Sequence, residues 1–224
     1  MLVGAATPQV QPLLCSWYVT AKARGAISEE SMQTIKRSTF RYTAAFCEEN
    51  IWWAAHDLAR NGYSCSDLQV LLFTNPSQQV LMFNQSVVPK GAPTLWDYHV
   101  VLQLGNGASA QILDFDTRLD FPVPLEKYVR ESFPSPNMVP DHYPAWVRVI
   151  PARSYLQRFD SDRSHMRGVL PDKDFPKYPP IRATALTDAI QLSDYRDLQA
   201  DLSDGSRVLS LQNWLAEAGL LQSN

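Results

Sequence analysis

The sequence predicts one α+β domain built around a central antiparallel sheet. A chain of 224 residues with 45% hydrophobic residues can bury a single sizeable core. Strand-like runs fill the middle of the chain, and helical patterns stand on either side of them. A Gly105-Asn106-Gly107 turn joins two of the runs as a hairpin, which is an antiparallel pair.

Residues 1–40 read as an N-terminal extension, and residues 41–224 as the single domain. Within the extension we expect a helix over 29–38. Ser28 is a favourable cap for it, and the two glutamates that follow suit the positive end of the helix dipole.

The domain contains two expected helices. In EENIWWAAHDLAR, residues 48–60, apolar residues recur on a broad face, and Asn61-Gly62 ends the pattern. Near the C-terminus, Ser210 caps an apolar stripe over 211–218 that Gly219 terminates.

The strands are expected where β-branched and aromatic residues are bounded by turn residues. LWDYHVVLQL, residues 95–104, is the strongest signal, and SAQILDFDT, residues 109–117, returns beside it as the hairpin partner. The remaining expected strands are 68–75, 78–85 and 146–150.

Composition excludes several functions. The net charge is −3 and no polybasic block occurs, so we expect no nucleic-acid partner. No run approaches the roughly 18–20 apolar residues of a membrane span, so we expect no membrane partner. LDFDTRL suggests a metal pair or an aspartyl phosphatase, but Arg118 stands where the phosphatase needs Thr or Val. With no Gly-rich phosphate loop, HExxH or CxxC either, we expect neither metal nor cofactor.

Cysteine usage suggests a location. Cys15, Cys47 and Cys65 are an odd number at no metal spacing, and the N-terminus lacks the early Lys or Arg of a secretion signal. We therefore expect reduced thiols and a cytoplasmic protein, most simply a monomer.

Cys47 directly precedes the helix expected at 48–60. At a helix N-terminus, free backbone N–H groups and the dipole lower the pKa of a thiol and can hold an oxyanion. Glu48 and Glu49 oppose this, because a neighbouring negative charge raises the pKa of a thiol. The alternative is a buried cysteine packed on the helix, since free Cys is among the most buried residue types.

His99 is the best candidate for a base that serves Cys47. It shares one face of its strand with Asp97, and a histidine in so apolar a run is semi-buried and needs hydrogen-bond partners. A purely structural role meets that need equally well. His56 follows Cys47 by about half a revolution of the helix and faces away, and His142 reads as a loop residue without a role.

Asp114 is the candidate third member of a triad. A hairpin loop over 105–108 places it opposite His99, about 5 Å away on one face of the sheet. An odd loop without a bulge would put Leu113 there instead. The triad therefore requires an even loop or a bulge; otherwise Asp114 partners a nearby loop or ends a strand in solvent.

Four motifs occur in order: CEEN at 47–50, WDYHV at 96–100, DFDT at 114–117 and SYLQRFDSDRSHM at 154–166. Together they resemble the protein N-terminal glutamine amidohydrolase family, and the similarity runs from about residue 42 to Gly219. The resemblance implies a papain-like or transglutaminase-like α+β fold, in which a catalytic helix packs against the central sheet. It also implies deamidation of an N-terminal glutamine to glutamate, in service of an N-degron degradation pathway. The implied triad is Cys47, His99 and Asp114.

The chemistry implied by the family is thiol acyl transfer without a cofactor. The partners are peptides or proteins with a free N-terminal Gln, whose α-ammonium needs an acidic or carbonyl receptor. The candidates for substrate binding are Glu48, Asp97, Asp160, Ser161, Asp162 and His165. For the loop that holds the last three, the structural alternative is an Arg163–Asp162 pair that pins it.

Two rival functions remain open. The same triad suits a cysteine peptidase or a transglutaminase-like enzyme that acts on internal glutamine. The chain would otherwise be a catalytically silent module that binds N-termini.

Overall fold

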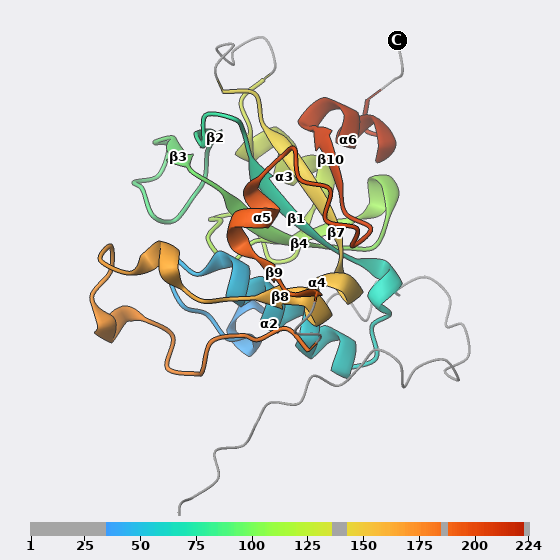
Figure 1. Ribbon diagram of the computed structural model, residues 1–224. Coiled ribbons are helices and arrows are strands. Elements are labelled where there is room, and N and C mark those ends of the chain that lie inside the picture. Colours follow the sequence, from blue (N-terminus) through green and yellow to red (C-terminus); the bar gives the residue numbers. More distant parts are fainter. Residues whose placement is uncertain (1–34, 136–142, 185–187, 222–224) are drawn as a thin grey trace, which may run out of the picture.

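The computed structural model describes residues 35–135, 143–184 and 188–221 (Figure 1). At its centre is a six-stranded sheet in the order β10-β7-β1-β4-β5-β6, in which every neighbouring pair is antiparallel. The strands of this sheet are β1 (Leu68–Thr74), β4 (His99–Leu104), β5 (Gln111–Leu113), β6 (Val123–Pro124), β7 (Trp146–Pro151) and β10 (Arg207–Ser210). The predicted central antiparallel sheet is confirmed.

Helices cover both faces of the sheet, as Figure 1 shows. One face carries α2 (Cys47–Arg60), α4 (Ala152–Arg158) and α5 (Leu192–Arg196). The other carries α3 (Leu125–Ser132) and α6 (Leu211–Glu217). The fold is therefore a mixed α and β structure in three layers.

Short elements complete the described part of the chain. An antiparallel pair joins β2 (Val80–Met82) to β3 (Thr94–Trp96), and a parallel pair joins β8 (Phe159–Asp160) to β9 (Ile190–Gln191). The 3-10 turns are Arg37–Thr39, Cys65–Asp67, Gly107–Ser109, Ser164–Met166 and Asp172–Asp174. None of the helices within the described residues is long and apolar enough to cross a membrane.

Burial on both faces explains the unbroken apolar run over residues 70–73 within β1. Val70 and Leu72 pack in the core beneath α2, whereas Leu71 and Phe73 pack in the core beneath α3 and α6. A strand buried on both faces needs apolar residues at every position, and the alternation of a half-buried strand disappears.

The strand expected over 95–104 is two strands. β3 ends at Trp96 and pairs with β2, and β4 begins only at His99. The Thr74 hydroxyl donates to the Asp97 carbonyl at 2.8 Å and holds the break between them. Two further expected strands, 78–85 and 109–117, shorten to β2 and β5.

The hairpin register differs from the expected one by two residues. Leu104 pairs with Gln111 and Leu102 with Leu113, so the connecting loop covers 105–110 rather than 105–108. The loop is still even, and Asp114 keeps to the face of His99. It lies diagonally from the histidine instead of directly opposite.

Both helices expected in the domain are confirmed, and α2 begins one residue earlier than expected. The Ser210 hydroxyl accepts a hydrogen bond from the Asn213 backbone N–H at 3.1 Å, which is the predicted N-cap of α6.

The helix expected over 29–38 lies mostly outside the described residues. Its described part, from residue 35 on, is not α-helical. Ile35 is buried in the core, and the Arg37 guanidinium donates to the carbonyl groups of Asp114 and Leu119 at 3.4 Å. Contacts with the domain therefore begin before residue 41.

Candidate active site

A tight turn places Cys47 at the first position of α2. The Asn50 side chain accepts from the Thr43 backbone N–H and donates to the Thr43 carbonyl, both at 2.8 Å. Ala45 has a φ of 65°, a left-handed conformation that is uncommon for a residue with a Cβ. These contacts hold the chain in a reversal directly before the cysteine.

Cys47 is free, partly exposed and protonated at rest. Its thiol donates to Glu48 Oε2 at 3.8 Å, and the Val100 backbone N–H donates to the sulfur. Burial raises the pKa of the thiol well above its usual value, and the Glu48 charge raises it further. Of the two opposing effects that the sequence indicates, the Glu48 charge therefore prevails together with burial, and the net pKa is raised in spite of the backbone N–H groups.

His99 and Asp114 form a fully buried pair. His99 Nε2 lies 3.0 Å from Asp114 Oδ1, and the imidazole stacks on Trp96 with centroids 5.2 Å apart and planes 13° apart. Burial alone would lower the pKa of His99, but Asp114 outweighs it and the net pKa is raised. Burial alone would raise the pKa of Asp114, but His99 outweighs it and the net pKa is lowered. His99 Nδ1 is buried and has no hydrogen-bond partner among the described residues.

Asp114 receives further donors that the sequence did not identify. Besides His99, Gln85 Nε2 donates to Asp114 at 3.3 Å, the Tyr128 hydroxyl at 2.9 Å and the Asp116 backbone N–H at 2.9 Å. A carboxylate with several donors is stabilised in its ionised form. Gln85 and Tyr128 come from distant elements, and no local pattern could have indicated them.

Asp116 joins this group as a third buried titratable residue. His99, Asp114 and Asp116 each offer one ligand atom, and these atoms lie within 4.8 Å of one another. Asp114 already accepts several hydrogen bonds, however, and Asp116 accepts one from the Tyr42 hydroxyl at 2.6 Å. The donor set therefore suits an oriented imidazole better than a metal ion.

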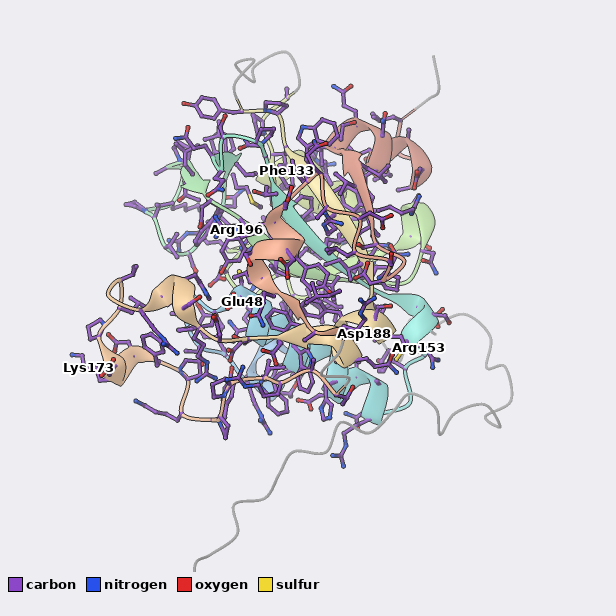
Figure 2. All side chains as sticks on the ribbon, in the orientation of Figure 1. Glu48, Phe133, Arg153, Lys173, Asp188 and Arg196 are labelled. Atoms are coloured by element: carbon purple, nitrogen blue, oxygen red, sulfur yellow. The ribbon has the colours of Figure 1, made fainter. Side chains whose placement is uncertain are left out.

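Glu48, which Figure 2 labels, follows Cys47 in the first turn of α2 and is fully buried. The Tyr98 hydroxyl donates to its Oε2 at 3.0 Å, and His165 Nε2 lies 3.5 Å from its Oε1. Burial raises the pKa of Glu48 to about 8. Burial, and then the Arg196 charge, lower the pKa of His165, so its imidazole is neutral near pH 7.

The loop that follows β8 is fastened to α2 by a different pair from the expected one. The Arg163 guanidinium binds Glu49 through two hydrogen bonds of 2.8 Å, and the Ser161 hydroxyl donates to Glu49 at 2.6 Å. Arg163 thus pairs with Glu49 and not with Asp162, whose side chain accepts from the Ser164 backbone N–H at 2.8 Å.

The other candidate acids already have basic partners. Asp97 is 54% exposed and lies 3.2 Å from the Arg196 guanidinium. Asp160 accepts from Arg182 at 2.9 Å.

Two residues have contacts elsewhere in the described part of the chain or lie outside it. His56 stacks on Trp52, and His142 lies outside the described residues. Cys65 is disulfide-bonded, which corrects the expectation that all thiols are reduced.

The structure thus gathers five of the predicted site residues around the start of β4. The five are Cys47, Glu48, His99, Asp114 and His165. Ser161 lies behind them as a support for Glu49.

Comparison with known proteins agrees with the residue pattern. A family model described as N-terminal glutamine amidase matches residues 42–217. A protein N-terminal glutamine amidohydrolase of Bos taurus is 36% identical over 128 residues, which are 56% of this chain and 62% of the bovine protein. The relative of the same name from Drosophila ananassae is 32% identical over 182 residues, 78% of this chain and 86% of the fly protein. The chain therefore matches less than two thirds of the bovine protein but most of the fly protein.

The family model covers most of the chain, and the four motifs noted above all fall within it. The chain belongs to the N-terminal glutamine amidase family.

Proposed function

We propose that this protein is a hydrolase that converts the N-terminal glutamine of peptides or proteins to glutamate and releases ammonia. Membership of the amidase family supports the reaction. The observation that carries the mechanism is the buried His99–Asp114 pair, whose Nδ1 is unpartnered while the sulfur of Cys47 meets the backbone of the next residue, Val100.

Acylation begins with the neutral thiol. Its proton passes to His99 Nδ1 as the Cys47 sulfur bonds to the side-chain carboxamide carbon of the substrate. Backbone N–H groups at the start of α2 hold the oxyanion. His99 then gives the proton to the nitrogen, the C–N bond breaks, ammonia leaves and a γ-thioester remains.

Deacylation reverses these roles with water. His99 takes a proton from water as the oxygen adds to the thioester carbon. The C–S bond breaks, the proton returns to the Cys47 sulfur, and an N-terminal glutamate is released. Asp114 keeps the His99 ring in one orientation and stabilises its protonated form in both halves of the reaction.

We further propose that the fold is papain-like or transglutaminase-like, since the Cys, His and Asp come in order from a helix, a strand and the residue directly after the neighbouring strand. His165 would form one wall of the substrate site, with Ser161 and Asp162 shaping the loop that presents it. Asp97 at the rim would meet later substrate residues.

We also propose a monomer that acts in the cytoplasm and feeds a degradation pathway. Size-exclusion chromatography and cell fractionation test the two proposals.

The test of function is ammonia release from four matched peptides. They begin with Gln, Asn or N-acetyl-Gln, or carry Gln internally, and each is assayed with wild type and Cys47→Ala. Turnover of the Gln-initiated peptide alone, lost in the variant, is the expected result.

Other outcomes lead to the rival functions. Activity on internal or acetylated Gln would indicate a transglutaminase-like enzyme, and peptide-bond cleavage would indicate a cysteine peptidase. Binding of the Gln-initiated peptide without turnover would indicate a silent N-terminus-binding module.

A further inference from the structure

We propose that Glu48 is the receptor for the α-ammonium group of the substrate and so sets the requirement for a free N-terminus. This inference rests on the proposed amidase function. It assigns one residue to the recognition step, which the triad does not explain.

One of the two carboxyl oxygens of Glu48 has no hydrogen-bond donor in the described part of the chain. Oε2 accepts from the Tyr98 hydroxyl at 3.0 Å and from the Cys47 thiol at 3.8 Å. Oε1 is buried without a hydrogen-bond partner among the described residues. Its nearest basic group is the neutral His165 imidazole at 3.5 Å. A buried acceptor without a donor costs free energy, and an ammonium ion would supply both the donor and the countercharge.

The other acidic side chains near the site already have basic partners. Glu49 is paired with Arg163 through two hydrogen bonds, and Asp97 is paired with Arg196. Asp114 holds the His99 ring.

Asp116 is the remaining competitor. It accepts from Tyr42, and the charges of His99 and Arg37 both act on it. No Lys or Arg ion pair to Glu48 occurs within the part of the chain that the structure describes.

The length of glutamine fits this arrangement. Its α-nitrogen and its carboxamide carbon are separated by four bonds, which span about 5 Å when extended. An ammonium on Oε1 lies on the side of Glu48 away from the sulfur, which contacts Oε2. The carboxamide carbon can then meet the sulfur of Cys47. Asparagine is one bond shorter, so it cannot reach both groups equally well.

His165 is the partly exposed side chain beside Oε1, with 17% of its surface accessible. It contacts the Tyr98 hydroxyl at 3.2 Å and stands at the edge of the same carboxyl group. We place the ammonium next to this ring, so His165 forms the entrance to the receptor.

The experiment compares two substrates that differ only in the amine: a Gln-initiated peptide and the same peptide with a desamino-glutamine residue. Ammonia release is measured for wild type, Glu48→Gln, Glu48→Asp and Glu126→Gln, whose wild-type residue is an exposed acid on α3. Wild type and Glu126→Gln should prefer the amine-bearing peptide by roughly 10²-fold or more in kcat/KM, as expected for a buried charge pair.

Glu48→Gln should bring that ratio close to 1 by losing activity on the amine-bearing peptide alone. Glu48→Asp keeps the charge and should restore part of the preference. Its retained charge also keeps the test valid if Glu48→Gln does not fold.

An unchanged preference in Glu48→Gln would overturn the inference and direct the same assay to Asp116→Asn. Equal loss on both substrates, with an unchanged melting temperature, would also overturn it, because Glu48 would then act on the thiol and not on the amine. Wild type that turns over neither peptide would instead refute the proposed amidase function itself.

Discussion

At the scale of single residues, two consecutive residues of the WDYHV motif bind the two buried acids of the site. The Tyr98 hydroxyl donates to Glu48, whereas His99 binds Asp114. The sulfur of Cys47 accepts a hydrogen bond from the backbone N–H of Val100, the residue after His99. Our two proposals thus assign substrate recognition to the acid that Tyr98 binds, and catalysis to His99.

Replacing Asp114 with Asn should remove the charge that orients His99 and stabilises its protonated form. We expect kcat to fall by about 10²- to 10⁴-fold with a smaller change in KM. Because Asp114 raises the pKa of His99, the limb of the pH–rate profile that reports this histidine should move to lower pH in the variant. The matched control is Asp120→Asn, an exposed acid paired with Lys127. A kcat within twofold of wild type would contradict the role of Asp114.

At the scale of the elements, the site depends on how the first turn of α2 is held. Asn50 closes the preceding reversal from within the helix, and Glu49 ties the same turn to Arg163. Arg163 itself has a φ of 56°, a strained conformation that the surrounding contacts maintain. Asn50 and Glu49 lie in the same helical turn as Cys47, so the loss of their contacts would shift the sulfur.

Asn50→Ala should lower both stability and kcat. It removes two hydrogen bonds to Thr43, and we expect a loss of about 1–2 kcal/mol in the free energy of unfolding. Urea unfolding and ammonia release measure the two effects. Asn61→Ala, which removes an exposed hydrogen bond at the other end of α2, should leave kcat unchanged. Equal kcat in the two variants would show that the turn does not position Cys47.

The Glu49–Arg163 pair should be strongly coupled. Arg163→Met leaves the Glu49 charge buried without a partner, and we expect a loss of about 3–5 kcal/mol in stability. In the double variant with Glu49→Gln the loss should be smaller than the sum of the two single losses. Arg167→Met, at an exposed position, should cost about 0.5 kcal/mol or less. Additive single losses would argue against a coupled pair.

At the scale of the whole molecule, the site places a buried carboxyl group where its ionisation opposes folding. The pKa of Glu48 rises from 4.5 to about 8 on folding. An acid with a raised folded-state pKa contributes stability that is present below its unfolded pKa and is lost as pH rises through the folded value. Glu48 therefore lowers the stability progressively as pH rises from about 4.5 to 8, and the loss persists at higher pH.

Glu48→Gln should remove this pH dependence. Relative to wild type, the variant should gain stability as pH rises from 5 to 8.5, by at most about 5 kcal/mol, which is the upper limit that the pKa change allows. Urea unfolding at several pH values measures the difference. The free energy of unfolding of the control variant Glu126→Gln should change with pH in the same way as that of wild type. A constant difference between Glu48→Gln and wild type across this range would contradict the raised pKa.

The sequence by itself determined the antiparallel sheet, a helix over 48–60 directly after Cys47, and the identity of the three triad candidates. Periodicity, turn residues and motif order lie within short stretches of the chain, so they can be read without tertiary contacts. The sequence left open whether the hairpin loop is even, which the triad requires. The structure has an even loop, with a register two residues away from the expected one.

Only the tertiary structure decided what surrounds those residues. Arg163 reaches Glu49 across 114 residues of sequence, and Tyr98 reaches Glu48 across 50. Such pairs depend on which elements pack together, and no local pattern encodes that. The raised pKa of the Cys47 thiol was decided in the same way, because its largest cause is burial, which exists only in the folded protein.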